Sequence, residues 1–122
     1  MARTSLSWAN LMTLGIDMED VGRFKLPKTH AFVRKIFTEK EIIYAYSKKK
    51  SHVHLCGMFC AKEAIRKAGI GSSLLMREIE IDRDHKGKPF AKLAGKKSRF
   101  EISISHTNTH AIACALRRNG RH

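Results

Sequence analysis

One stretch organises this chain: HVHLCGMFCAKEAIRKA, from His52 to Ala68. It has no proline and a single glycine, Gly57, and it lies between the polar segment 48–51 and Gly69. Such a run predicts a long helix that ends at Gly69, because glycine is common just past a helix end.

Three residues of this predicted helix share one face. Phe59, Glu63 and Lys67 stand at i, i+4 and i+8, with Lys62 beside them. A carboxylate can hold a hard cation such as Mg²⁺, and ammonium groups can contact phosphate. On spacing alone, the simpler explanation is an exposed ion pair between Glu63 and Lys67, with Phe59 in the core.

Upstream of the helix, the sequence predicts one strand and two short helices. The apolar run Leu11–Ile16 is typical of a buried strand and ends at Asp17. Residues 32–37 place apolar side chains at helical spacing, and Thr38 to Glu41 has the spacing of a capping box, so another helix begins there. The expected buried stripe of that second helix comprises Ile42, Ile43 and Tyr46.

Downstream of the helix, the period of the pattern changes. Polar and apolar residues alternate in Glu78–Asp82 and again in Glu101–His106, which predicts two half-exposed strands. Residues 84–87 are turn formers and indicate a hairpin before Pro89. The near-continuous apolar run Ala111–Leu116 predicts a more buried strand.

Length and charge restrict the function. With 122 residues, the chain is expected to form one domain, residues 1–122, with a core of about residues 11–116. It has 24 Lys and Arg against 11 Asp and Glu, a net charge of +13, which favours polyanionic partners. Aromatic residues make up only 7%, so few side chains could stack on nucleic-acid bases. A basic nucleic-acid-binding module without catalysis is therefore the alternative rather than the first choice.

The cysteines indicate a reducing compartment. Cys56, Cys60 and Cys114 form no C-x-x-C pair, so we expect no disulfide framework and a cytoplasmic location. Residues 1–14 lack an apolar run of signal-peptide length, and no segment approaches a membrane span. His52, Cys56 and Cys60 also stand at i, i+4 and i+8, so a zinc site on the long helix is a further alternative.

A pair of acids follows the first predicted strand. Asp17 ends the apolar run, and Glu19 comes two residues later, so both point the same way if the strand continues. If a helix begins at Met18 instead, Glu19 turns aside. Together with Glu63, these carboxylates could hold one cation, although Asp17 could equally cap the next helix.

Four motifs in order resemble the 4′-phosphopantetheinyl transferases. They are Gly15-Ile16-Asp17 followed by Arg23, then Phe59-Cys60-Ala61-Lys62-Glu63-Ala64-Ile65-Arg66-Lys67-Ala68, then Gly87-Lys88-Pro89, and finally Ser103-Ile104-Ser105-His106. The sequence is most similar to the small holo-acyl-carrier-protein synthase branch, over about residues 11–116. Each motif is weak alone, whereas four in this order are specific.

The resemblance implies both an activity and a fold. The activity is Mg²⁺-dependent transfer of 4′-phosphopantetheine from coenzyme A to a serine of apo acyl carrier protein, which releases adenosine 3′,5′-bisphosphate and supports fatty acid biosynthesis. The fold is α+β, with a long helix packed against an antiparallel sheet, in a homotrimer whose active sites lie between subunits. A chain of 122 residues would have difficulty enclosing coenzyme A alone, which agrees with shared sites.

The resemblance also implies roles for individual residues. The metal ligands would be Asp17, Glu63 and Glu19. Phosphate contacts would come from Lys62 and Lys67, and either Lys67 or Glu63 would handle the serine proton. Further contacts with coenzyme A would come from Gly87, Lys88, Pro89, Ser105, His106 and Thr107. The residues expected to face the acidic recognition helix of the carrier protein are Arg23, Lys28 and Arg34.

Two positions depart from the pattern of the small family members. Met58 stands where they usually carry Arg before the Phe of the helix motif, so one contact is missing. The sequence Asp17-Met18-Glu19 also resembles the corresponding segment of the larger, two-lobed transferases, in which the second acid is a metal ligand.

Overall fold

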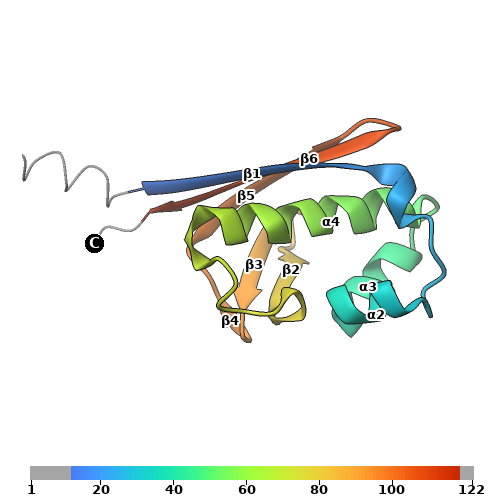
Figure 1. The fold of residues 1–122 in the computed structure, drawn as a ribbon, viewed down its shortest axis with the longest axis horizontal. Helices are drawn as coiled ribbons and strands as arrows, with labels where there is room; N and C mark the ends of the chain where they lie inside the picture. Colours follow the sequence, from blue (N-terminus) through green and yellow to red (C-terminus); the bar gives the residue numbers. More distant parts are fainter. Residues whose placement is uncertain (1–11, 119–122) are drawn as a thin grey trace, which may run out of the picture.

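The computed structural model describes residues 12–118, so Leu11, the first residue of the predicted strand, lies outside the described part. A long central helix, α4, lies between two antiparallel sheets (Figure 1). The elements are β1 (Met12–Asp20), η1 (Val21–Phe24), α2 (Ala31–Ile36), α3 (Glu39–Tyr46), α4 (Ser51–Ile65), η2 (Arg66–Ile70), η3 (Met76–Glu78), β2 (Ile79–Arg83), β3 (Pro89–Leu93), β4 (Lys96–Lys97), β5 (Phe100–His106) and β6 (His110–Arg118).

The strands form two sheets rather than one. The first has the order β1-β6-β5 and the second the order β2-β3-β4, and all pairings are antiparallel. The predicted α+β fold, with a long helix packed against an antiparallel sheet, is confirmed. Within residues 12–118, no helix is both long and apolar enough to span a bilayer.

Helix α4 is buried on almost every side. Eleven of its fifteen residues are buried, because sheets, η1 and α3 surround it. Phe59 is a core residue, as predicted, with its ring centroid 5.3 Å from that of Phe24 and 6.2 Å from that of Phe32. Met58, which departs from the expected motif, is buried as well and is a core side chain here.

The end of α4 differs from the prediction. The α-helix stops at Ile65 and continues as a wider π-type turn, in which Gly69 has φ 142°, and the chain leaves at Gly71 with φ 53°. Such widened turns are frequent at functional sites. Lys67 lies in this turn, before Gly69, which is the residue of the turn with non-helical dihedrals.

Helix α3 shows one correct prediction and one error. The capping box between Thr38 and Glu41 is present. Ile42 is buried as expected, but Ile43 is 65% exposed, and Ala45 takes its place in the core. The buried face of α3 comprises Glu41, Ile42 and Ala45, and Ile43 projects about 100° further round, beyond the edge of that face.

Candidate active site

Gly15 brings strand β1 into direct contact with α4. A Cβ at this position would lie 1.9 Å from the carbonyl oxygen of Ala64 and 2.9 Å from the amide nitrogen of Ala68. Only glycine allows the two backbones to approach so closely. This contact sets Asp17, two residues further along β1, beside the last turns of α4.

Asp17 and Lys67 meet across that contact. Lys67 Nζ donates to Asp17 Oδ1 at 3.1 Å and to the carbonyl oxygen of Ile16 at 3.2 Å. Asp17 is only 9% exposed. Its second oxygen, Oδ2, is buried and has no hydrogen-bond partner among residues 12–118. One oxygen of a buried carboxylate is therefore available for a ligand.

Glu19 and Glu63 add negative charge around Asp17. Strand β1 runs on to Asp20, so Glu19 points to the same side as Asp17, which resolves the alternative left open by the sequence. Burial raises the pKa of Glu19, and the neighbouring charges of Asp17 and Glu63 raise it further, whereas Arg23 opposes the shift. Carboxylates that repel one another in this way favour a bound cation.

Arg23 flanks these acids. Its guanidinium forms an ion pair with Glu19 and lies over two aromatic rings, 5.6 Å from the centroid of Phe24 and 5.9 Å from that of Phe59. Arg23 was predicted to face a protein partner, and it stands at the edge of the acidic cluster.

The hydrogen bond and charge of Asp17 raise the pKa of Lys67. Its ammonium therefore stays protonated at neutral pH. A protonated lysine is suited to contact phosphate oxygens, and it cannot accept a proton.

The acids do not form a complete metal site by themselves. Within residues 12–118, no three His, Cys, Asp or Glu side chains lie close enough together to hold a metal ion. Asp17, Glu19 and Glu63 are therefore not a preformed set of three ligands. Mg²⁺ is usually held by only one or two carboxylates, together with waters and substrate phosphates. The free oxygen of Asp17 and the mutual repulsion of the acids thus fit Mg²⁺ held jointly with a substrate.

Lys62 does not reach this cluster, which corrects the prediction that it contacts phosphate. Its side chain is fully buried and forms an ion pair with Glu41, with 2.7 Å between Nζ and Oε1. Lys62 and Glu63 are adjacent on α4 and so project about 100° apart. Because Glu63 faces the acids, Lys62 faces the core.

The zinc alternative is also wrong. The thiol of Cys56 points at the carbonyl oxygen of Glu19, 3.6 Å away, and that of Cys60 at the carbonyl oxygen of Ala111, 3.4 Å away. Both cysteines are buried and free, and they pack α4 against the first sheet. Within residues 12–118, these cysteines belong to no group of three His, Cys, Asp or Glu side chains that could hold a metal ion.

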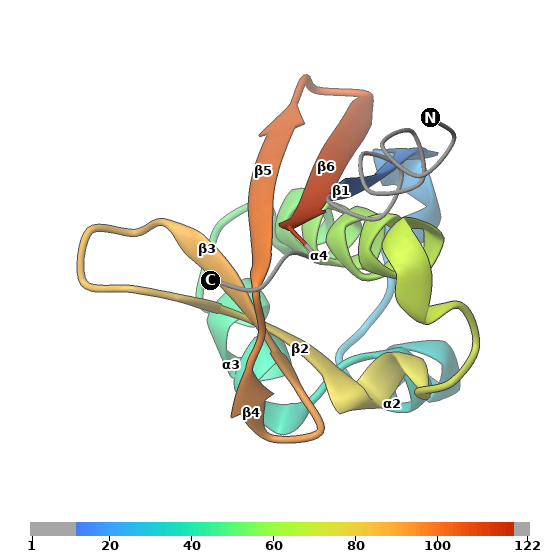
Figure 2. The same cartoon turned by 90° about the vertical axis from the view of Figure 1, so that its left-hand side faces the viewer.

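The remaining predicted coenzyme A residues lie on the opposite flank of α4. Figure 2 shows the β2–β3 hairpin extending on the β5 side, away from β1. Gly87 has φ 86° in that hairpin, and Lys88 Nζ lies 3.1 Å from Glu101 on β5. One chain therefore does not bring these residues together with Asp17.

The residues at the end of β5 that were predicted to contact coenzyme A point to different faces of the first sheet. His106 and Glu19 both pair with Ala111 on the central strand, so they share the inner face. Ser105 points to the outer face. Thr107 stabilises the β5–β6 turn, because its Oγ1 accepts from the amides of Thr109 and His110 at 3.2 and 3.1 Å.

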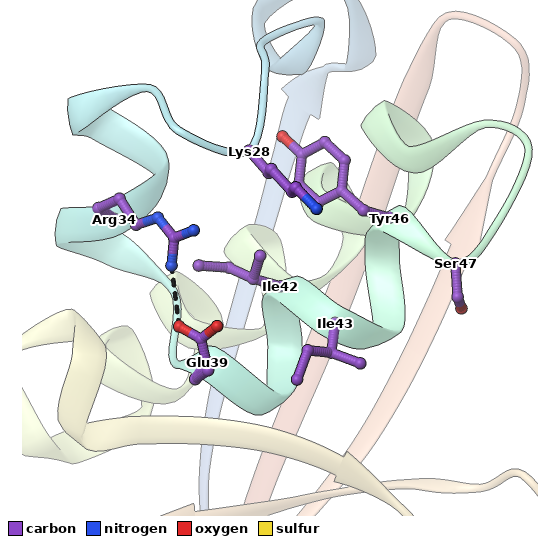
Figure 3. Close-up of a pocket in the computed structure, with 7 residues that line it drawn as sticks. All are labelled: Lys28, Arg34, Glu39, Ile42, Ile43, Tyr46 and Ser47. Carbon is purple, nitrogen blue, oxygen red and sulfur yellow. Dashed lines mark hydrogen bonds and ion pairs between the residues drawn. The ribbon is translucent and has the colours of Figure 1, made fainter.

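Lys28 and Arg34 line a separate hollow of about 260 Å³ between α2 and α3 (Figure 3). Arg34 forms an ion pair with Glu39 at 2.8 Å, and Ile42 and Ile43 lie nearby. The structure therefore separates these two partner-binding candidates from Arg23.

A larger, mainly apolar groove of about 580 Å³ lies directly beside Glu63. Its apolar walls come from α2, α4, the loop after η2 and the start of η3, and its cations come from α2, η2 and η3. The lining residues are Phe32, Lys35, Ile36, Phe59, Glu63, Arg66, Ser72, Leu74, Leu75, Met76 and Arg77. Sequence reasoning missed Arg66, Arg77 and the apolar run 74–76. That run, followed directly by Arg77, is the one signal that could have indicated the groove.

Comparison with known proteins agrees with this geometry. The family model of the 4′-phosphopantetheinyl transferase superfamily matches residues 13–116. This chain belongs to that superfamily. The 4′-phosphopantetheinyl transferase assignment confirms the prediction of an enzyme and disfavours the non-catalytic nucleic-acid module.

Individual relatives narrow the resemblance to one branch of the superfamily. A holo-[acyl-carrier-protein] synthase of Caldicellulosiruptor saccharolyticus is 36% identical over 117 residues, covering 87% of this chain and 95% of the relative. One of Thermoanaerobacter sp. is 39% identical over 116 residues, covering 84% of each. The crystal structure of a holo-(acyl-carrier-protein) synthase from Bacillus anthracis, in complex with CoA (3′,5′-ADP), has a TM-score of 0.75 and 29% identity, covering 90% of this chain and 99% of that one.

Proposed function

We propose that this chain transfers the 4′-phosphopantetheine group from coenzyme A to a serine of an apo acyl carrier protein, with Mg²⁺, in the cytoplasm and in support of fatty acid biosynthesis. The observation that carries the proposal is the cluster of Asp17, Glu19, Glu63 and Lys67 at the contact between β1 and α4. The matched relatives are holo-acyl-carrier-protein synthases, and a similar structure contains coenzyme A. The free thiols of Cys56, Cys60 and Cys114 agree with a reducing compartment.

The reaction needs charge neutralisation more than covalent help from the protein. The serine oxygen forms a bond to the β-phosphorus of coenzyme A, the pyrophosphate P–O bond breaks, and adenosine 3′,5′-bisphosphate leaves. Asp17, Glu63 and Glu19 would hold Mg²⁺, which when bound would supply positive charge to neutralise the pyrophosphate. The ammonium of Lys67 would contact a phosphate oxygen. Because its pKa is raised, Lys67 is not suited to take the serine proton, so we assign this proton to Glu63, acting through water.

The coenzyme A contacts are proposed to come from two subunits. Gly87, Lys88, Pro89, Ser105, His106 and Thr107 lie on the β5 flank of α4, whereas the acids lie on the β1 flank. In a homotrimer, the β1 flank of one subunit would face the β5 flank of the next. Such an arrangement would complete a site that one chain leaves in two halves.

The groove beside Glu63 is proposed to receive the carrier protein. Its apolar walls would take apolar side chains of a partner helix, and Lys35, Arg66 and Arg77 would attract acidic residues of that helix. Arg23 lies over Phe59, one of the groove residues, and is kept as a partner contact. We retain Lys28 and Arg34 as outer contacts of the same partner.

Intact-mass spectrometry tests the proposal. The purified chain is incubated with an apo acyl carrier protein, coenzyme A and Mg²⁺, and with the same mixture containing EDTA. We expect the carrier to gain the mass of one phosphopantetheine group only when Mg²⁺ is present. A carrier shown to accept the group from a known transferase, yet unmodified here, would refute the proposed function.

A further inference from the structure

The side chain of Lys62 joins several segments inside the molecule. Besides its ion pair with Glu41, Nζ donates to the carbonyl oxygens of Ile36 and Met76, each at 2.9 Å. The three hydrogens of the ammonium thus have three acceptors, and all of them are buried. Lys62 itself is on α4, Ile36 ends α2 and Met76 begins η3.

Glu41 extends the same network. Its Oε1 accepts from the amide of Thr38 at 2.8 Å, and its Oε2 accepts from the amide of Ile81 on β2 at 2.7 Å. One buried ion pair therefore connects α4 with α2, α3, η3 and β2. Burial pulls the pKa of Lys62 down and that of Glu41 up, and each charge opposes the shift of the other. Either charge would be costly without its partner.

The segments joined by Lys62 are the walls of the groove beside Glu63. Ile36 and Met76 line the groove, and their carbonyl oxygens are the two that Lys62 binds. Glu63, the next residue on α4, lines it as well. Loop 71–75 between η2 and η3 contains no regular helix or strand, and the bond from Lys62 to Met76 ties the end of this loop to α4.

We infer that Lys62 is a positioning residue that holds the walls of the groove at the spacing needed to recognise the carrier protein, and that it does not bind coenzyme A. This inference rests on the proposed function, and it replaces the phosphate contact expected for Lys62. It assigns to the lysine of the helix motif a role in selecting the acceptor protein, exerted from inside the core.

Steady-state kinetics of full-length Lys62→Met separates the two roles. Methionine keeps the length of the side chain but cannot donate to Ile36 or Met76. We expect KM for the carrier to rise by about tenfold to a hundredfold, since small misplacements of a binding surface are costly, and KM for coenzyme A to stay within about twofold. Hydrogen exchange of the amides in residues 72–78 should become faster in the variant.

Two further variants complete the test. Lys40→Met, on an exposed lysine that pairs with Asp82, is the matched control and should behave like the parent. If Lys62→Met does not fold, Lys62→Met with Glu41→Leu removes both buried charges and is measured in its place.

Two results would overturn the inference: a rise in KM for coenzyme A as large as that for the carrier, or unchanged kinetics and exchange. If the parent chain transfers nothing, the proposed function fails. The exchange measurement still decides whether Lys62 holds the loop.

Discussion

Glu63 is the residue on which the proposed chemistry depends most directly. It lies between the acidic cluster and the groove, and its ion pair with Arg66 is long, at 3.9 Å. Its side chain is 29% exposed, so ligands can reach it without a change in the fold. A carboxylate in this position can serve both a cation and the incoming serine.

Replacing Glu63 by Gln should remove transfer but leave the structure intact. The amide keeps the shape of the side chain but loses the charge that attracts Mg²⁺, so we expect kcat to fall by at least about a hundredfold. Circular dichroism and the melting temperature should stay close to those of the parent. Glu39→Gln, on an exposed carboxylate at the start of α3, is the control for loss of one negative charge. Turnover retained by Glu63→Gln would remove Glu63 from the mechanism.

At the scale of elements, the contact between β1 and α4 decides whether a site exists. Asp17 belongs to the strand and Lys67 to the turn that ends the helix, and the two are fifty positions apart in the sequence. Gly15 allows them to meet, because any side chain there would collide with the helix backbone at Ala64 and Ala68. Lys67 stands four residues after Glu63, on the same side of the helix, and its ammonium reaches Asp17.

Gly15→Ala should separate the strand from the helix. Backbone atoms cannot move aside as a flexible side chain does, so we expect unfolding to become easier by about 1–3 kcal/mol or more, measured by urea denaturation. Transfer activity should fall as well, since Asp17 moves with β1. Gly22→Ala is the matched control, because its nearest neighbour at 3.2 Å is a side-chain oxygen of Asp20 rather than backbone, and a side chain can shift; it should change stability by less than about 0.5 kcal/mol. Equal stability of the two variants would contradict the close contact.

For the whole molecule, the outer face of the first sheet is the notable surface. Met12, Leu14, Ile16 and Met18 alternate along β1 and are 47–63% exposed. Leu14, Ile16 and Met18 pair with the outward residues of β6, and together they form an apolar surface; the β6 residues are Leu116, Cys114 and Ile112. Soluble chains rarely leave such a surface uncovered, and a second copy of the chain would bury it.

Ile16→Lys should therefore prevent assembly. Light scattering coupled to size exclusion should give the mass of a trimer for the parent and of a monomer for the variant, because a buried lysine in this face would lack a partner. Activity should be lost together with the trimer if the site needs two subunits. Ile43→Lys changes an equally exposed apolar residue on α3 and should leave the mass unchanged. A monomeric parent would contradict shared active sites.

Prediction from sequence succeeded where the signal is local. Periodicity located the long helix and the strands β2, β5 and β6, and the capping box at Thr38 marked the start of α3. The short strand β4 was not predicted, and the first strand, expected to be buried and to end at Asp17, runs on to Asp20 with alternate residues exposed. It failed at Ile43 and at Lys62, because an apolar or a basic side chain does not by itself say which way it points. Lys62 illustrates the difficulty best, since a lysine is seldom fully buried and its partner Glu41 lies on another helix.

By itself, the sequence determined the order and type of the elements, the family, and most of the candidate acids and cations. These depend on neighbouring residues and on motifs that can be recognised along the chain. Only the tertiary structure decided that Asp17 meets Lys67, that Lys62 belongs to the core, and that the residues proposed to contact coenzyme A lie on two flanks of α4. The reason is physical: the close approach at Gly15 and the burial of the ion pair between Lys62 and Glu41 depend on packing between segments that are distant in the sequence.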